Sequence, residues 1–266
     1  MQRLITGFSN PTVKYLRSLR DKKHRKRAGQ FLVEGLRLLE DARAMGRIPQ
    51  ALVMAENRAP HELLARLEDE VSAAGGEVIT TTPDILSKIT GKENAQSVAG
   101  VFDEWDTSLE TLDRHAAPIW LVAQALRDPG NLGTMLRTGD AVGAGGLILL
   151  DESTDPYAVE AVRASMGAIF TQALVQARWD EFLPWLRGGP GQLVATWLGD
   201  DTQDYQAVRY AAPTFILTGN ESQGMPPAYA DAADVRVKMP MQGKADSLNA
   251  AVATAVMAYE VLNQRR

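Results

Sequence analysis

The feature that most restricts the fold of this 266-residue chain is a repeated alternation of short apolar runs with longer amphipathic stretches. In the second half, strand-like runs at 119–122, 147–150, 193–196 and 214–218 are separated by segments with helical spacing. Strands that are joined by helices lie parallel in one sheet, which the helices cover on both faces. The same alternation in residues 1–104 predicts a separate three-layer α/β unit.

Length and composition predict two domains. A chain of this size divides readily into two modest cores. Residues 105–117 lack strong periodicity and are expected to form a linker. We therefore expect one domain at 1–104 and a second at 118–266.

Composition also excludes several classes of protein. The chain is 45% hydrophobic and 23% charged, as expected of a globular protein. No run has the length of a membrane span, and the first residues lack the apolar core of a signal peptide. The absence of cysteine rules out disulfides and thiolate metal sites, and His24, His61 and His115 are too scattered to suggest a metal site. These features favour the cytoplasm, without a membrane partner.

One short segment near the N-terminus is strongly basic, although the whole chain has a net charge of -5. A local basic cluster on an acidic protein predicts contact with a polyanion, and a solvated helix end is the alternative. The cluster comprises Lys14, Arg17, Arg20, Lys22, Lys23, Arg25, Lys26 and Arg27.

The stretch 239–249 follows a strand-like run at 235–238 and leads into a helix at 250–262. Asp246 or Ser247 is expected to cap this helix. A strand, a polar loop and a capped helix form a place where backbone groups can hold a polar ligand, although an ordinary strand-to-helix turn has the same pattern. One apolar helix face is predicted from the spacing of Leu248, Val252, Val256, Tyr259 and Leu262.

Two further stretches, Leu-Thr-Gly-Asn-Glu-Ser-Gln-Gly at 217–224 and Asn-Leu-Gly-Thr-Met-Leu-Arg at 131–137, also follow expected strands. Ligands of parallel sheets bind at these carboxyl ends. In order and spacing, the three stretches resemble the motifs of the SpoU/TrmH class of SPOUT RNA 2′-O-ribose methyltransferases, over about residues 118–264. The resemblance implies S-adenosylmethionine as the cofactor and a trefoil knot in the C-terminal domain, which spacing alone does not show.

The resemblance also implies the catalytic residues. A ribose 2′-hydroxyl is a weak nucleophile that must be oriented and assisted in losing its proton. Arg137 is the leading candidate; because a guanidinium rarely loses its proton, we interpret it as a clamp on the adjacent phosphate rather than as a base. Asn131 would orient Arg137 or the RNA, and Glu221 would fix Arg137 or a helix N-terminus. Asn249 would contact the substrate ribose or Arg137, and Ser247 would order the loop. Turn and capping roles are the alternatives for these four residues.

Gly219, Met239 and Leu248 match family positions whose backbone groups hold the cofactor, and Thr196, Leu217, Thr218 and Met241 are expected to complete the lining. Core packing is the alternative for Leu217, Met239 and Leu248. The chain departs from the family pattern at Gly139 and Met239 and after Asn249, where Ala250-Ala251 replaces a more usual Val-Ser pair. These are packing positions, so activity is still expected.

The N-terminal part, with its stretches at 10–14 and 31–35 and Arg25, resembles the substrate-binding domain that often precedes these methyltransferases, a fold similar to an RNA-binding ribosomal protein. Its basic cluster would grip RNA phosphates. We expect methylation of large-subunit (23S-type) rRNA and a homodimer through the C-terminal domain, with Met257 and Tyr259 of the last helix in the interface or in the core. A tRNA 2′-O-methyltransferase, a methyltransferase acting on a protein or small molecule, and a non-catalytic RNA-binding ribosome-assembly factor are the alternatives.

Overall fold

The computed structural model describes residues 2–93, 96–220 and 222–266. It divides into two compact units. The first unit comprises the chain up to Trp105 together with Asp155–Phe170, and the second comprises Asp106–Thr154 and Thr171–Arg266. Within the described ranges, no helix is long and apolar enough to cross a membrane.

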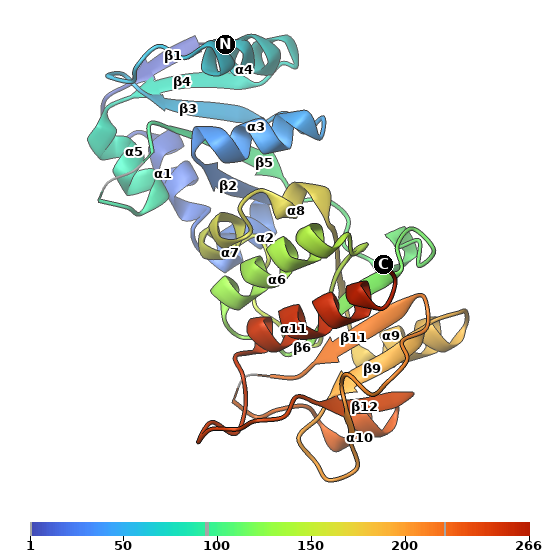
Figure 1. Cartoon of the computed structure of the whole chain (residues 1–266). Helices are drawn as coiled ribbons and strands as arrows, with labels where there is room; N and C mark the ends of the chain where they lie inside the picture. Colours follow the sequence, from blue (N-terminus) through green and yellow to red (C-terminus); the bar gives the residue numbers. More distant parts are fainter. Residues whose placement is uncertain (1, 94–95, 221) are drawn as a thin grey trace. The chain divides into compact units, whose positions relative to one another are not determined.

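The first unit is built on a five-stranded sheet (Figure 1). Only β5 runs antiparallel to its neighbours. The strands in spatial order are β1 (Gln2–Ile5), β4 (Glu77–Thr81), β3 (Ala51–Ala55), β5 (Val98–Asp103) and β2 (Gln30–Glu34).

Helices cover both faces of this sheet. Ala99 and Val101 pack into the core beneath α1 and α5, whereas Gly100, between them, lies against Leu39 of α3. The alternation of side chains along a strand produces these two faces, and the expected three-layer α/β unit is confirmed. The helices are α1 (Pro11–Ser18), α2 (Lys22–Ala28), α3 (Leu36–Ala44), α4 (Glu62–Ala73) and α5 (Pro83–Thr90).

The basic helices begin at well-defined caps. The Asn10 side chain accepts a hydrogen bond from the Thr12 N–H at 2.9 Å, and Pro11 occupies the first helical position. Such a proline costs nothing because the first N–H groups of a helix have no partner within it. Asp21 caps α2 by accepting from Lys23 and His24.

The segment Asp155–Phe170 lies in the first unit, although the predicted domain boundary placed it in the second. This segment forms two short helices, α7 (Val159–Ala164) and α8 (Ala168–Thr171). Met166 and Gly167 separate them with φ values of 50° and 95°, a conformation that cannot continue a helix.

The second unit is built on a seven-stranded sheet in which every pair is parallel, as predicted. The 105–117 stretch contains a short 3₁₀ helix, η1 (Leu109–Thr111), and packs Leu109, Leu112 and Ala117 against the core of this unit. The strands in spatial order are β10 (Gln203–Asp204), β12 (Val235–Lys238), β9 (Gln192–Thr196), β11 (Thr214–Thr218), β6 (Ile119–Gln124), β7 (Gly146–Leu150) and β8 (Ala173–Ala177).

Two helix pairs cover this sheet. Helices α6 (Pro129–Val142) and α11 (Ala250–Asn263) pack against each other and against the central strands (Figure 1). Helices α9 (Trp179–Arg187) and α10 (Pro227–Asp231) contribute to the core on the other face. Strand order does not describe how the chain is threaded, so the trefoil knot stays a prediction.

Helix α11 buries a different face from the one that large apolar residues suggested. Leu248, Val252 and Tyr259 are exposed by 39%, 47% and 51%, whereas Met257 is fully buried. Small side chains make the contact because α11 lies close to α6 and the sheet. The buried positions are Ala250, Ala251, Ala253, Thr254, Met257, Ala258 and Val261.

Candidate active site

A cavity of about 430 Å³ lies at the carboxyl ends of β9, β11 and β12. Six of the seven residues predicted to hold the cofactor line it: Thr196, Thr218, Gly219, Met239, Met241 and Leu248. The seventh, Leu217, is fully buried in the strand below, and its carbonyl oxygen accepts a hydrogen bond from Thr196 Oγ1 at 3.3 Å. Leu217 therefore supports the cavity from beneath.

Several lining residues were not predicted. Trp197, Leu198 and Gly199 follow β9, and Asn220 and Met225 belong to the loop after β11. Their position in the sequence could have identified them, because residues directly after a parallel strand lie at the ligand-binding edge of a sheet. Leu198 is 66% exposed, so this wall of the cavity presents apolar surface to solvent.

Gly219 is required by the close approach of two backbone segments. A Cβ atom at this position would lie 2.7 Å from the Met225 amide nitrogen and 2.9 Å from the Gly224 carbonyl carbon. Asn220 holds the same loop: its side-chain oxygen accepts from the N–H groups of Ser222 and Gln223 at 2.9 Å. Its amide group donates to the Ala125 carbonyl at 2.7 Å, which ties the loop to the end of β6.

Two buried threonines join the strand and the helix that border the cavity. The hydroxyl groups of Thr218 and Thr254 lie 2.8 Å apart, and Thr254 donates to the Ala250 carbonyl at 2.8 Å. Because both side chains are almost completely buried, this pair fixes the first turns of α11 against β11.

Asn249, rather than Asp246 or Ser247, caps α11. Its side-chain oxygen accepts from the Ala251 N–H at 2.9 Å and the Val252 N–H at 3.2 Å. Its amide group donates to Asn131 Oδ1 at 2.9 Å. The first and third motifs, 118 residues apart in the chain, therefore meet at one hydrogen bond.

The other predicted catalytic residues take no part in this hydrogen bond. Ser247 lines the cavity from the exposed loop and donates to Asp246 at 3.1 Å. Arg137 is exposed on α6, with no ion pair to any described residue. Glu221 lies outside the described residues. No cluster of metal-binding side chains occurs within 2–93, 96–220 and 222–266.

Outside the cavity lining, Asp151 at the end of β7 holds α9 and α10. Its carboxylate accepts from the Tyr229 hydroxyl at 3.0 Å and the Trp179 N–H at 3.1 Å. The rings of Trp179 and Tyr229 stack with centroids 3.8 Å apart. Burial raises the pKa of Tyr229 to about 12, and its hydrogen bond to Asp151 adds to the shift. The tyrosine is therefore a neutral donor at ordinary pH.

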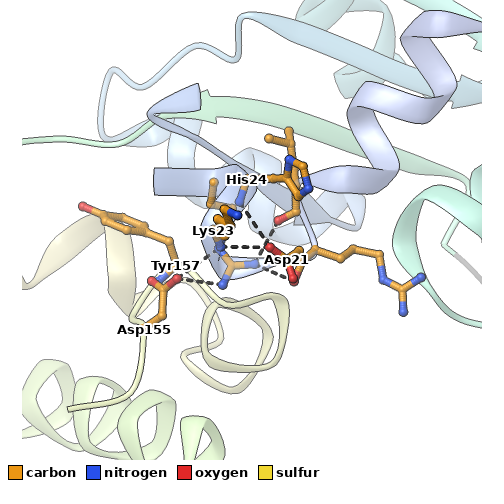
Figure 2. A network of polar contacts seen from close by, with 8 residues as sticks. Asp21, Lys23, His24, Asp155 and Tyr157 are labelled. Carbon is orange, nitrogen blue, oxygen red and sulfur yellow. Dashed lines mark hydrogen bonds and ion pairs between the residues drawn. The ribbon is translucent and has the colours of Figure 1, made fainter. Parts of the chain in front are cut away.

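In the first unit, seven of the eight predicted RNA-binding residues are exposed, and Arg25 is not. In the network around Asp155 (Figure 2), this carboxylate accepts from two guanidinium nitrogens of Arg25 at 2.7 and 3.1 Å. A third donates to the Leu19 and Arg20 carbonyls at 2.9 and 2.7 Å. The prediction that Arg25 contacts RNA is thereby corrected, because its donors are already used in an ion pair whose side chains are only 3% and 9% exposed.

The second unit thus combines a fully parallel sheet with a cavity at its carboxyl edge, which is the arrangement of a ligand-binding α/β domain. Residues 118–259 match the model of the SpoU rRNA Methylase family, and residues 10–100 match the MRM3-like substrate binding domain. The chain belongs to the SpoU rRNA methylase family.

Solved structures and characterised relatives support this assignment over the whole length. The AdoMet-bound rRNA methyltransferase from Sinorhizobium meliloti is 36% identical, with a TM-score of 0.92 and 98% of both chains covered. The 23S rRNA (guanosine(2553)-2′-O)-methyltransferase RlmP of Bacillus subtilis is 30% identical over 97% of this chain and 98% of its own. The 23S rRNA (uridine(2479)-2′-O)-methyltransferase of Streptomyces viridochromogenes is 32% identical over 93% and 87%. The predicted family and fold class are confirmed.

Proposed function

We propose that this protein transfers a methyl group from S-adenosylmethionine to a ribose 2′-hydroxyl of large-subunit rRNA. The hydrogen bond between Asn249 and Asn131 carries the proposal, because it joins the first and third motifs beside the cavity formed by the second and third. Relatives that cover nearly the whole chain are named for the same reaction on 23S rRNA.

The cavity suits the cofactor in size and chemistry. Its volume of about 430 Å³ falls within the roughly 300–1,000 Å³ of pockets that hold small ligands. Met239, Met241 and Leu248 offer apolar surface for a flat aromatic group, and the segment around Gly219 offers backbone groups at close range. When bound there, S-adenosylmethionine supplies the methyl group on a positively charged sulfur.

The remaining steps fall to groups of the chain. The hydroxyl oxygen must be aligned with the methyl carbon and lose its proton as the new bond forms. We assign the alignment to Arg137, whose exposed guanidinium is available to a phosphate oxygen next to the target ribose. The Asn131–Asn249 pair holds the starts of α6 and α11 together and so sets the position of this site.

The first unit is proposed to bind the RNA. Its exposed basic residues lie on or between α1 and α2 and would contact phosphates, which contributes affinity and register without reading sequence. The residues retained in this role are Lys14, Arg17, Arg20, Lys22, Lys23, Lys26 and Arg27.

A homodimer in the cytoplasm completes the proposal. Helix α11 presents Val252 and Tyr259 to solvent on one face, and such apolar surface favours association. Met257 is removed from the proposed interface because it is fully buried. Sedimentation at micromolar concentration should give twice the mass of 28.9 kDa, and a single-chain mass would contradict the dimer.

The test is methyl transfer from labelled S-adenosylmethionine to separate pools of rRNA and tRNA. Wild-type protein should label rRNA, and Arg137→Ala should lower kcat by roughly 10²-fold or more, as removal of a charge-stabilising group does. Arg209→Ala is the matched control, since Arg209 is an exposed arginine of the same unit outside the cavity. Label in tRNA alone would favour the tRNA enzyme. RNA binding without any transfer would favour an assembly factor.

A further inference from the structure

A second cavity, of about 450 Å³, crosses one end of the sheet in the first unit. Its walls come from the beginnings of β1, β2, β3 and β4 and the end of β5, with α1 beside them. The register confirms the arrangement: Arg3 pairs with Ile79, Ala51 with Val101, and Gln30 with Asp103. The hollow crosses five neighbouring strands. Because adjacent strands are about 4.8 Å apart, it is an elongated groove.

A chain of hydrogen bonds holds the polar side chains of this groove in fixed positions. The two oxygens of Asp103 accept from the side-chain amides of Gln30 and Gln50, each at 2.7 Å. The side-chain oxygen Oε1 of Gln30 in turn accepts from the Tyr15 hydroxyl at 2.5 Å. Burial, and then the charge of Asp103, raises the pKa of Tyr15, so its hydroxyl stays protonated and keeps this bond.

The groove also presents an exposed aromatic ring and an arginine. Tyr15 is 42% exposed, although it is a large aromatic residue. At the far side, Arg3 donates through Nη2 to Thr12 and Glu77, each at 2.8 Å, while its buried Nε has no acceptor among the described residues. An exposed aromatic ring and oriented amides are groups that recognise a flat heteroaromatic ligand.

We propose that this groove is a binding site for an unpaired nucleobase of the RNA substrate, with Tyr15 stacking on the base and Gln50 and Arg3 contacting its polar edge. This inference rests on the proposed action on RNA and adds a site that reads RNA structure to a unit whose basic helices contact only phosphates. A duplex does not fit, since its bases are stacked and their edges are paired.

The neighbouring charges explain how a strand would be led to the groove. Pro11, Thr12 and Tyr15 of α1 face the groove, whereas Lys14, Arg17 and Ser18 of the same helix border a separate basic hollow. The exposed side of α1 thus carries an aromatic ring next to two cations. Backbone contact by the cations with base stacking on the ring is the usual arrangement for single-stranded nucleic acid.

The experiment measures the affinity of the full-length protein for a fluorescein-labelled single-stranded RNA of mixed sequence and for a duplex of equal length, at several salt concentrations. Tyr15→Leu should weaken single-strand binding by roughly 5- to 150-fold, as loss of one base–aromatic stack does. The slope of affinity against salt should not change, because no phosphate contact is lost. Tyr15→Phe should retain most of the affinity.

Lys14→Ala is the matched variant: it should weaken single-strand and duplex binding alike and reduce the salt slope by about one contact. Thermal unfolding of each variant shows that the first unit remains folded. In addition, ultraviolet cross-linking of wild-type protein to purified large-subunit rRNA should place a nucleotide adduct on Tyr15.

Wild-type affinity in Tyr15→Leu, or an equal loss for duplex and single strand, would overturn the nucleobase site. This failure is distinct from failure of the proposed function. If the protein transfers no methyl group to rRNA but Tyr15→Leu still loses single-strand binding, the reaction is wrong and the site stands. If methylation proceeds and Tyr15→Leu binds RNA normally, the site is wrong and the reaction stands.

Discussion

Replacement of Arg25 by alanine should destabilise the first unit severely while leaving the cofactor cavity intact. The substitution removes the partner of Asp155, whose side chain is only 9% exposed, and strips the Leu19 and Arg20 carbonyls of their donor. Removal of one member of a buried pair costs about 3–5 kcal/mol, because the other charge stays buried and unpaired. A typical domain has about 5–15 kcal/mol in total, so a large share of the stability is lost.

Hydrogen exchange measured by mass spectrometry resolves this loss within the chain. Amides of β2 and of α7 should exchange roughly 10²- to 10⁴-fold faster in Arg25→Ala through local opening. Amides of β11 in the second unit should be unchanged. Lys26 is an exposed neighbour of Arg25 on the same helix. Lys26→Ala should change the free energy of opening obtained from exchange by less than about 0.5 kcal/mol.

A second variant separates the loss of the pair from the loss of packing. Arg25→Met combined with Asp155→Leu replaces the ion pair by apolar side chains of similar size and should recover most of the stability. A cost below about 1 kcal/mol for Arg25→Ala would refute the structural role assigned to the pair. So would a loss of RNA affinity in Arg25→Lys without any change in exchange.

Three further outcomes follow from the same structure. Gly219→Ala places a methyl group 2.7 Å from the Met225 amide nitrogen. Because such overpacking costs about 1–3 kcal/mol, calorimetry should show roughly 5- to 150-fold weaker binding of S-adenosylmethionine. Unchanged affinity would contradict the close approach of the two backbone segments at Gly219. Asn249→Asp retains the cap oxygen but loses the donor to Asn131, so kcat should fall while the melting temperature holds; equal kcat would remove the pair from the mechanism. Burial raises the pKa of Tyr157 above its ordinary value of about 10, so its stabilising contribution is complete below pH 10 and is lost as pH rises further. In Tyr157→Phe, the free energy of unfolding should therefore fall less steeply with pH above 10. An unchanged slope would contradict the burial of this hydroxyl.

Sequence pattern predicted the sheets well where strands are long and buried. The runs at β6, β7, β9 and β11 are apolar on both faces because helices cover both sides, and such runs are hard to mistake. The strands that pattern missed are at sheet edges: β1 at one edge of the first sheet and β10, with only two residues, at one edge of the second. Edge strands are short and partly solvated, so their sequences carry little periodicity.

The errors in α11 and Arg25 have a common physical cause. Apolar spacing identifies large side chains but not how closely two helices approach, and the approach of α11 to α6 selects Ala253 and Ala258 over Val252 and Tyr259. A run of charges likewise does not reveal which member turns inward. Arg25 does so because Asp155, 130 residues later, lies against it.

The residues proposed to hold the cofactor come together at one cavity, which the sheet architecture alone does not predict. Motif order located Gly219, Met239 and Leu248 at one edge of the sheet, and the cavity lies there. Trp197 and Leu198 were missed because they belong to no motif, although they follow the same strand as Thr196. A motif marks groups tied to the reaction, whereas the rest of a pocket wall is set by tertiary packing.

The chemical position of the transferred methyl group tests ribose 2′-O-methylation of large-subunit rRNA most directly. Purified rRNA is incubated with the protein and labelled S-adenosylmethionine, digested to nucleosides and analysed by mass spectrometry. Label is expected in one 2′-O-methylnucleoside of the large-subunit RNA, with the bond after it resistant to alkaline cleavage because the 2′-hydroxyl is blocked. A label on a base, or none in rRNA under conditions where the protein binds the cofactor, would contradict this expectation.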